Sequence, residues 1–217
     1  MRIGVLALQG DFDLHRKALA RVEAHGGLGE PVESVEVRKP EQLADLDGLI
    51  IPGGESTTLL KLMNDWGFPP ALTDFHARGK PIFGTCAGLI LLAREVENPR
   101  QPALGLIDVG VERNAYGRQR ESFETREVAD LDGPRSVEMV FIRAPRIRRV
   151  GAGVNVLARQ GGDPVMATQG PVLVATFHPE LTDDPSVHRY FCEMVQRSRR
   201  PGLAQAEPAG RDRKSVV

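Results

Sequence analysis

The stretch Pro81–Leu92, PIFGTCAGLILL, contains the pattern that decides the fold. It opens with a short apolar run, Pro81–Gly84, which predicts a buried strand, and the residues from Cys86 to Arg94 predict a buried helix. Between them Gly84–Gly88, GTCAG, supplies the small residues that a tight strand-to-helix turn requires. A buried strand that leads directly into a helix is the repeating unit of an α/β sheet.

The same alternation occurs earlier in the chain. Ile3–Leu8 and Gly48–Ile51 are continuous apolar runs, which is typical of parallel strands covered on both faces. We expect a helix after each of them, the first capped by Asp11 and the second capped by Ser56. Strands that alternate with helices in this way predict βαβ units and a parallel sheet.

The second half of the chain has strand candidates that follow one another closely, separated mostly by Gly, Pro and Asp. They are Leu104–Val111, Val137–Ile142, Val154–Ala158, Pro164–Thr168 and Val172–Phe177. We expect some antiparallel pairing there, within the same sheet, and a last helix from Pro185 to about Gln196. The predicted fold class is therefore α/β: a single-domain three-layer sandwich with a mostly parallel central sheet and helices on both faces.

Composition and charge narrow the class of protein. The 217 residues include 28 Lys and Arg against 29 Asp and Glu, and 41% are hydrophobic. This is ordinary for a globular protein, and the balance gives no sign of bulk nucleic-acid binding. Two cysteines are too few for a disulfide framework, and no paired Cys or His spacing accompanies them, so we expect no metal site.

The two ends of the chain have a different character from its middle. Acidic and basic residues directly follow the first apolar run, and no stretch is long enough to span a membrane, so we expect a cytoplasmic protein. Residues 197–217 contain six basic and two acidic side chains, several Gly and Pro, and few large apolar residues. We predict one domain over residues 1–196 and a disordered basic tail over 197–217.

Cys86 occupies the strand-to-helix turn. Such a turn holds a side chain exposed at the edge of a sheet, and the N-terminus of the following helix favours a thiolate. These features predict a nucleophile. The alternative is a small buried cysteine that only fills a tight turn, and the pentapeptide alone does not distinguish the two.

His178 and Glu180 follow another apolar strand, in the segment Phe177–Glu180, FHPE. Proline favours extended geometry in the residue before it, and residues two apart in an extended segment point to one side. Glu180 would then orient the His178 ring, in the arrangement that activates a thiol nucleophile. The alternative is a histidine at the surface end of a strand.

The segment Pro52–Ser56, PGGES, also directly follows a predicted strand. Its two glycines leave backbone N–H groups free to face an oxyanion or a carboxylate. The alternatives are a simple turn and a phosphate loop, and the chain lacks the spacing of a phosphate loop. Because the carboxyl ends of parallel strands meet at one edge, we expect this segment near Cys86 and His178.

Together the three motifs resemble those of the class I, triad-type glutamine amidotransferases. The likeness narrows to the glutaminase subunits of pyridoxal 5'-phosphate synthases and spans about residues 3–195. The segments that carry it are Leu8–Asp11 (LQGD), Pro52–Thr58 (PGGESTT), Phe83–Leu92 (FGTCAGLILL), Val111–Gln119 (VERNAYGRQ), Ser122–Glu124 (SFE), Phe141–Pro145 (FIRAP) and Phe177–Thr182 (FHPELT).

The resemblance implies a role for each matching residue. Cys86 would attack the side-chain amide of L-glutamine, His178 would transfer the proton, and Glu180 would hold His178. The residues implied in binding L-glutamine are Gly54, Glu55, Ser56, Arg113, Ile142 and Arg143. Backbone N–H groups of Gly53 or Gly54 and of Ala87 would form the oxyanion hole.

The resemblance also implies a partner. Family members pass ammonia to a (β/α)8-barrel synthase subunit, and Gln9 and Gly10 are candidates for coupling to it. Because pyridoxal 5'-phosphate is a product of that complex, we expect no bound cofactor. Two other functions are left open by the sequence: another thiol hydrolase of the same fold, and a binding subunit without catalytic activity.

Some residues have no place in these motifs. Arg146, Arg148 and Arg149 form a basic stretch that is either a solvated face or a contact for a partner or a phosphate. We expect Cys192 in the core. The remaining histidines lie outside any motif and are expected at the surface or in helices: His15, His25, His76 and His188.

Overall fold

The computed structural model describes residues 1–26, 28–113 and 122–200. Within them nine strands form one sheet, and five of these run parallel to one another. In the order in which they lie side by side, the parallel strands are β2 (Glu33–Val37), β1 (Arg2–Leu6), β3 (Gly48–Ile51), β4 (Ile82–Thr85) and β12 (Val172–Ala175).

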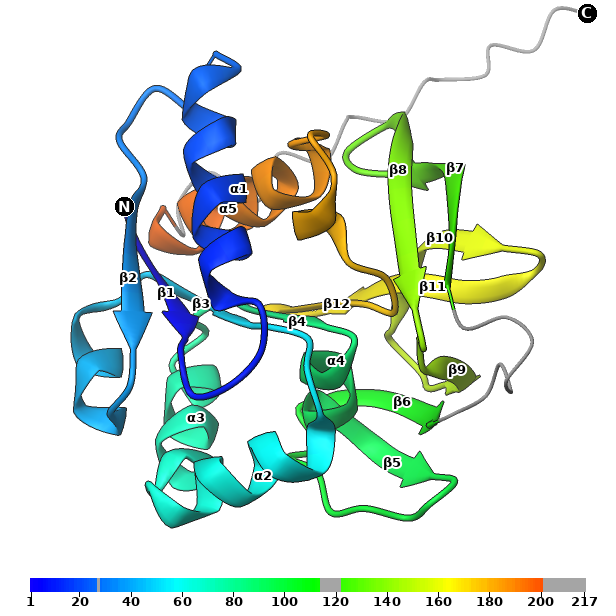
Figure 1. Cartoon of the computed structure of the whole chain (residues 1–217). Helices are drawn as coiled ribbons and strands as arrows, with labels where there is room; N and C mark the ends of the chain where they lie inside the picture. The colour runs from blue at the N-terminus through cyan, green and yellow to red at the C-terminus, as the bar shows by residue number, and fades with distance from the viewer. Residues whose placement is uncertain (27, 114–121, 201–217) are drawn as a thin grey trace, which may run out of the picture.

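The second half of the chain continues this sheet with antiparallel strands, as predicted. They are, outward from β12, β11 (Asp163–Gln169), β10 (Asn155–Gln160), β7 (Ser122–Asp130) and β8 (Pro134–Ile142). A smaller sheet stands beside them and was not predicted as separate (Figure 1). Its strands are β5 (Ala93–Glu97), β6 (Ile107–Glu112) and β9 (Arg146–Val150).

Helices cover the parallel strands on both faces (Figure 1). On one face lie α1 (Phe12–Ala24) and α5 (Ser186–Arg199); on the other lie α2 (Ser56–Asp65), α3 (Phe68–Ala77) and α4 (Ala87–Leu92). Short 3-10 helices are η1 (Pro40–Asp45) and η2 (Pro179–Leu181). The predicted three-layer α/β sandwich is confirmed.

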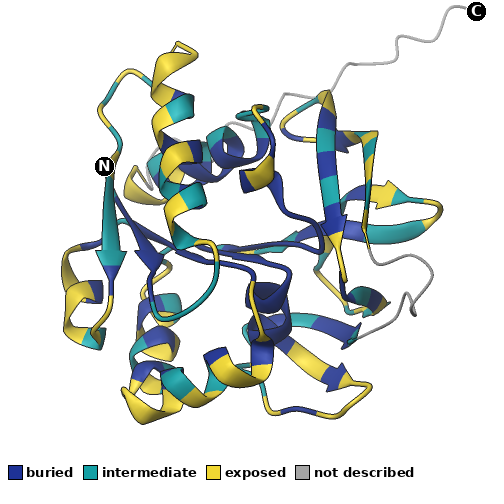
Figure 2. Cartoon of the chain, viewed as in Figure 1, coloured by how far each residue is buried: buried dark blue, intermediate teal, exposed yellow. Residues whose placement is uncertain are grey.

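Successive residues of the central strands enter opposite cores, because side chains alternate across a strand. In β3, Leu49 and Ile51 pack with α2, α3 and α4, whereas Ile50 packs with α1 and α5. Whereas the edge strand β2 is only partly buried, β1, β3, β4 and β12 are buried between the two helix layers (Figure 2). Burial on both faces explains why these strands are continuous apolar runs in the sequence.

Two predicted helices differ from the observed ones at their ends. The helix predicted from Cys86 to Arg94 ends at Leu92, because Ala93 starts β5 and pairs with Ile107 of β6. The N-cap of α2 is Glu55 rather than Ser56: its carboxylate accepts hydrogen bonds from the backbone N–H groups of Thr57 and Thr58. A carboxylate at this position also faces the positive end of the helix dipole.

The predicted boundary of the folded domain is three residues short. Helix α5 continues to Arg199, whereas the basic tail was predicted from residue 197. Arg197 pairs with Asp132 at 2.7 Å and Arg199 pairs with Glu30 at 2.7 Å, so these two residues belong to the packed domain. Residues 201–217 of the predicted tail lie outside the described residues.

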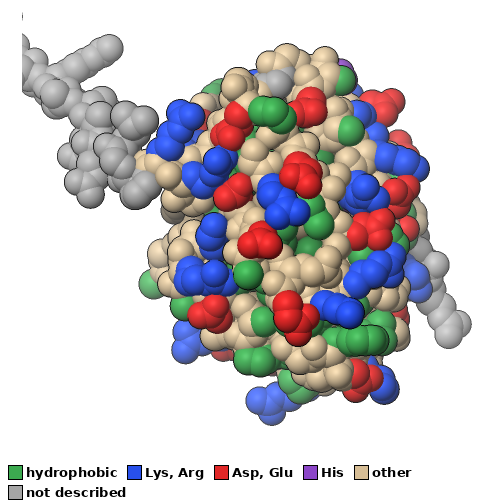
Figure 3. All heavy atoms as spheres, turned by 90° about the vertical axis from the view of Figure 1, so that its left-hand side faces the viewer, with side chains coloured by type: hydrophobic (Ala, Val, Ile, Leu, Met, Phe, Trp, Pro, Cys, Tyr) green, Lys and Arg blue, Asp and Glu red, His purple; other side chains and the backbone are tan. Residues whose placement is uncertain are grey.

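The surface mixes both signs of charge. On the face shown in Figure 3, basic and acidic side chains are interspersed. The basic stretch after the FIRAP segment follows the same pattern: it forms β9, where Arg146 pairs with Asp163, Arg148 with Glu112, and Arg149 with Glu95 and Asp108. In the described part of the chain, no helix is long and apolar enough to cross a membrane.

Candidate active site

Three neighbouring parallel strands end at the same edge of the sheet, and each is followed by one of the predicted site motifs. Gly53 follows β3, Cys86 follows β4, and His178 follows β12. Because β4 lies between β3 and β12, the cysteine is flanked by the glycine segment on one side and by the histidine on the other. The predicted convergence of the three motifs is therefore observed.

Cys86 has an unusual backbone conformation, with φ of 48° and ψ of −101°. Non-glycine residues with positive φ are rare and cluster at functional sites, where the surrounding structure holds them. Here the Cys86 N–H donates to the carbonyl of Ala175 in β12 at 2.9 Å, which fixes the turn between two strands. The side chain is 8% exposed and stands at the start of α4.

His178 joins the cysteine to an acid. Its Nδ1 lies 2.7 Å from Oε1 of Glu180, and its ring is also hydrogen-bonded to the Cys86 side chain. Burial lowers the pKa of His178, but the bonds to Cys86 and Glu180 outweigh it and raise the pKa to about 10. Glu180 is 2% exposed; burial raises its pKa, but the nearby His15 and the bond to His178 outweigh burial and lower the pKa to about 2, so Glu180 is ionised. At neutral pH this arrangement is a buried imidazolium between the Cys86 sulfur and a carboxylate.

Gly53 packs directly against this pair. A Cβ atom at Gly53 would lie 2.5 Å from Cε1 of His178 and 3.4 Å from Cβ of Cys86. Only glycine fits at this position without a shift of the histidine. The backbone of Gly53 and Gly54 is thus within a short distance of the thiol, while Ala87 begins α4 and has a first-turn N–H without an intrahelical acceptor.

Gln9 and Gly10 lie behind the glycine segment. Oε1 of Gln9 accepts a hydrogen bond from the Glu55 N–H at 3.1 Å. A Cβ at Gly10 would overlap the carbonyl oxygen of Gly53, and Gly10 has φ of 92°. The segment after β1 therefore touches the backbone of the Pro52–Ser56 segment directly.

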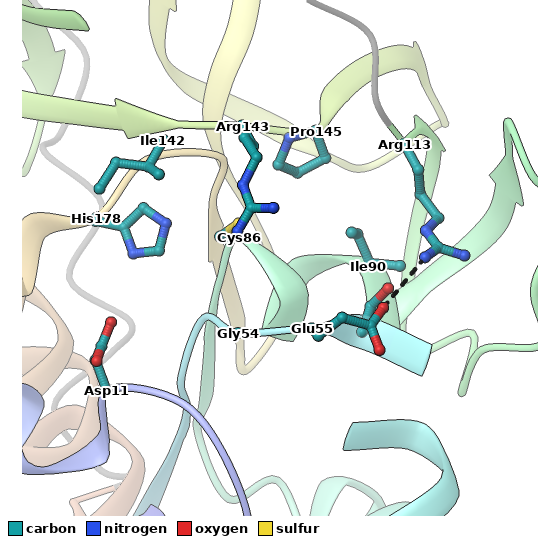
Figure 4. Close-up of a pocket in the computed structure, with 11 residues that line it drawn as sticks. Asp11, Gly54, Glu55, Cys86, Ile90, Arg113, Ile142, Arg143, Pro145 and His178 are labelled. Atoms are coloured by element: carbon teal, nitrogen blue, oxygen red, sulfur yellow. Dashed lines mark ion pairs between the residues drawn. The ribbon is translucent and has the colours of Figure 1, made fainter. Parts of the chain in front are cut away.

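A pocket of about 220 Å³ opens over the thiol. It is lined by Cys86 and His178 and by every residue that the sequence implicated in binding glutamine: Gly54, Glu55, Ser56, Arg113, Ile142 and Arg143 (Figure 4). Among the described residues, Asp11, Ile90 and Pro145 also line the pocket and were not predicted as site residues. Asp11 belongs to the LQGD segment and Pro145 to the FIRAP segment, so the resemblance of these two segments could have indicated that both residues lie at the site.

The pocket has two walls of different origin. The ends of β3, β4 and β12 supply one wall, with Cys86 and His178. The other wall comes from the neighbourhood of the small sheet, since Arg113 follows β6 and the segment with Arg143 connects β8 to β9. The remainder of the VERNAYGRQ segment, residues 114–119, lies outside the described residues.

Arg113 is held against the pocket wall. One of its guanidinium nitrogens donates to Oγ1 of Thr57 at 3.1 Å and lies 3.6 Å from Oε1 of Glu55 (Figure 4). Hydrogen bonds from Thr57 and Thr58 hold the pKa of Glu55 at about 2, so this carboxylate is charged. The Ser56 hydroxyl donates to Gln101 at 3.2 Å, which makes Ser56 a structural support for the pocket floor.

Two histidines outside the motifs lie in helices, as expected, but their contacts were not predicted. His15 and His188 are helical, but both are completely buried, and they contact each other beside Glu180. Their separation by 173 residues hides this contact from the sequence. Cys192 is buried, as predicted, and burial raises its pKa to about 12.

Comparison with known proteins matches residues 5–197 to the model of the SNO glutamine amidotransferase family. The chain belongs to that family. Among the relatives of this chain is the pyridoxal 5'-phosphate synthase subunit PdxT of Koribacter versatilis, 56% identical over 90% of this chain and 96% of the relative. The PdxT of Niallia circulans is 54% identical over 92% of this chain and all of the relative.

Solved structures agree with the family assignment. A crystal structure described as a glutamine amidotransferase has a TM-score of 0.81 and 50% identity, and the match covers 89% of this chain and 98% of that one. The PurLQS structure from Thermotoga maritima has a TM-score of 0.61 at 17% identity, which shows a shared fold. The sequence-based prediction of the family and of the fold class is thereby confirmed.

Proposed function

We propose that this chain is a glutaminase that hydrolyses L-glutamine to L-glutamate and ammonia. The observation that carries the proposal is the hydrogen-bonded series Cys86, His178 and Glu180 at one end of a pocket whose other wall holds Arg113 and Arg143. Membership of a glutamine amidotransferase family supports the choice of amide over other acyl substrates.

In the first half-reaction the Cys86 sulfur attacks the side-chain amide carbon of glutamine. The thiol proton resides on His178, which donates it to the amide nitrogen as the carbon–nitrogen bond breaks. Ammonia leaves, and a γ-glutamyl thioester remains on Cys86. Glu180 keeps the ring oriented and stabilises its positive charge throughout, without itself taking the proton.

In the second half-reaction water attacks the thioester carbonyl. His178 removes a proton from that water. The carbon–sulfur bond then breaks, which releases glutamate and regenerates the free thiolate of Cys86. Both tetrahedral intermediates carry an oxyanion, which would accept hydrogen bonds from backbone N–H groups of Gly53 or Gly54 and of Ala87. One such donor typically lowers a barrier by ~3 kcal/mol.

The pocket is suited to the amino-acid end of glutamine. The α-carboxylate requires a fixed cation, and a guanidinium fork binds it through two parallel hydrogen bonds. Among the described residues, the arginines that line the pocket are Arg113 and Arg143. The carboxylates of Asp11 and Glu55 line it as well and suit the α-ammonium group.

Ammonia is lost if it escapes to water, and the relatives' description as subunits of pyridoxal 5'-phosphate synthase supports a partner that consumes it. We assign the partner as a (β/α)8-barrel synthase subunit, with Gln9 and Gly10 coupling the two proteins. Pyridoxal 5'-phosphate is the product of that complex, so hydrolysis by this chain needs no bound cofactor.

The test is release of glutamate from glutamine by the full chain, alone and with the synthase subunit. We expect slow hydrolysis alone and faster hydrolysis in the complex. Cys86→Ala should abolish hydrolysis while the synthase still copurifies, and Cys192→Ala, which changes the other buried cysteine, should retain it. Absence of hydrolysis in the wild-type complex would reject the proposal, and activity in Cys86→Ala would reject Cys86 as the nucleophile.

A further inference from the structure

Behind Glu180, on the side away from the pocket, stand the two histidines that no motif explains. His15 comes from α1 and His188 from α5, and both side chains are fully buried. Neither lines the pocket. Buried imidazoles lose hydration and are retained where they make specific hydrogen bonds, so the contacts of this pair require an explanation.

His15 occupies the centre of the cluster. Its Nε2 lies 3.4 Å from Oε2 of Glu180 and 3.1 Å from Oγ1 of Thr85, the residue before Cys86. Its Nδ1 lies 3.0 Å from Nε2 of His188. The two oxygens of Glu180 therefore face two different histidines, Oε1 toward His178 and Oε2 toward His15.

The protons of this cluster can be assigned from its acceptors. The hydrogen-bond contact of His15 Nε2 is Oγ1 of Thr85, and Oε2 of Glu180, 3.4 Å away, has no hydrogen-bond partner within the part of the chain that the structure describes. Because an ionised carboxylate repels a lone pair, the favourable arrangement has the His15 proton on Nε2, donated to Thr85 and close to Oε2. The Nδ1 of a neutral His15 is then an acceptor, and His188 donates to it from Nε2. This leaves Nδ1 of His188 without a proton, and that atom is the ring nitrogen with no hydrogen-bond partner among the described side chains.

The opposite tautomers are unfavourable. They would direct a lone pair of His15 at the carboxylate and bury an unpaired N–H on His188, which costs more than a buried lone pair. Burial lowers the pKa of both rings, that of His188 to about 3, so both are neutral at physiological pH. The charged groups that face the pair are Glu180, His178, Asp11 and Arg21.

Helix α1 holds the Glu180 turn at a second point. Arg21 donates to the backbone carbonyl of Glu180 at 3.3 Å and to that of Thr182 at 2.7 Å. The backbone of the turn and the Glu180 side chain are therefore both anchored to the same helix, six residues apart. This double attachment restricts the rotation of the carboxylate relative to His178.

We propose that His15 is a positioning residue of the reaction, whose Nε2–H faces the second oxygen of Glu180 and stabilises the charge of that carboxylate, and that His188 fixes the tautomer of His15. The inference rests on the proposed function only for its effect on turnover. Its effect on the reactivity of Cys86 is independent of the substrate. Without the His15 N–H, the ionised form of Glu180 is less stabilised. The imidazolium form of His178 is then less stabilised in turn, and so is the thiolate form of Cys86 at neutral pH.

The experiment compares variants that keep or remove the donor. His15→Gln retains an amide N–H at a similar reach, whereas His15→Leu has similar volume and no donor. The first measurement is the alkylation rate of Cys86 by iodoacetamide against pH in the full chain, followed by mass spectrometry of the peptide. We expect the acid limb of His15→Leu to move up by about one pH unit, and that of His15→Gln to stay near wild type.

The second measurement is glutamine hydrolysis in the complex with the synthase. In His15→Leu we expect kcat to fall by about 10- to 100-fold with little change in KM, since the variant acts on a proton-transfer group. His188→Leu should move both measurements in the same direction by a smaller amount. Cys192→Ala, on the next turn of α5 after His188, should lower Tm without moving the alkylation profile.

The outcomes separate the two proposals. A folded His15→Leu with wild-type alkylation and kcat would overturn the positioning role, as would a His15→Gln as impaired as His15→Leu. If His15→Leu does not fold, His188→Leu decides: an unchanged alkylation profile rejects the inference. A wild-type complex without glutaminase activity would reject the proposed function, while the alkylation profiles would still test His15.

Discussion

The Nδ1 atom of His178 lies 2.7 Å from Oε1 of Glu180, and the two side chains are buried together in the turn that follows β12. Because only Pro179 separates them, the local backbone places the acid beside the ring. The pair does not depend on contact between distant elements, but its charge state depends on the thiol that β4 brings to the other side of the ring.

Replacement of Glu180 by Gln should change both the rate and its pH dependence. In the wild type the pKa of His178 is about 10, so the imidazolium is intact at neutral pH and lost as pH rises through about 10. We expect the alkaline limb of kcat/KM near that pH. In Glu180→Gln the pKa should fall toward its ordinary value, which moves the limb to lower pH, and kcat should fall by ~10²- to 10⁴-fold.

Glu41→Gln, on the exposed side of η1, is the control for loss of one carboxylate. It should leave the pH profile unchanged. Circular dichroism at each pH must show that both proteins stay folded. An alkaline limb of Glu180→Gln at the wild-type position would contradict the assignment of Glu180 as the group that charges His178.

Gly53→Ala should reduce turnover more than stability. The added Cβ would lie 2.5 Å from Cε1 of His178, so the ring must move away from its hydrogen bonds. A displacement of this kind disturbs proton transfer and the nearby backbone donors, and we expect kcat to fall by ~10²-fold or more. Steady-state kinetics measure the loss, and a Tm within a few degrees of wild type would assign it to the site.

Arg113→Ala should chiefly raise KM for glutamine. The guanidinium lines the pocket and is the proposed partner of the substrate carboxylate. Loss of a charge-assisted hydrogen bond costs ~1.5–3 kcal/mol, which corresponds to about a 10- to 100-fold higher KM. Arg94→Ala, an exposed arginine of β5 outside the pocket, is the control. An unchanged KM in Arg113→Ala would count against its binding role.

Arg199 should stabilise the fold in a pH-dependent manner. Its hydrogen bond holds the pKa of Glu30 at about 2, below the ordinary value of 4.5. Because the folded pKa is the lower one, the stabilisation is present above pH 4.5 and is lost as pH falls toward 2. Arg199→Ala should therefore lower the free energy of unfolding by ~0.5–1 kcal/mol at pH 7 and by less at pH 3.

Urea unfolding at the two pH values measures this difference. Arg200→Ala, just beyond the end of α5, is the matched control and should change stability little at either pH. A cost of Arg199→Ala that is equal at pH 7 and pH 3 would show that packing of the side chain, rather than its charge, is the source of the stabilisation.

Much of the active site was predictable because its parts are local. The residues around Cys86, His178 and Gly53 each follow a buried strand directly, and the parallel arrangement brings strand ends to one edge. The sequence pattern therefore predicts that these three motifs converge on one site. Arg113 and Arg143, in contrast, were implied by resemblance, since nothing local indicates that they face the thiol.

Other features depend on long-range contacts and were missed. His15 and His188 lie on helices whose polar and apolar residues do not reveal that α1 and α5 meet over Glu180. The end of α4 at Leu92 is set by pairing of Ala93 with Ile107, not by a helix-stop signal. Likewise, Glu55 caps α2 although Ser56 is also a good capping residue, because the chain turns one residue earlier.

The two walls of the pocket separate reactivity from substrate choice. The thiol, the imidazole and the backbone donors belong to the ends of the large sheet, whereas both pocket arginines belong to segments that flank the small sheet. We therefore expect substitutions around β6 and β9 to alter substrate binding while Cys86 and His178 keep their positions. Under the proposed function, the large sheet would supply the reacting groups and the segments that flank the small sheet would select the substrate, so a graft of those segments between homologues should transfer substrate preference.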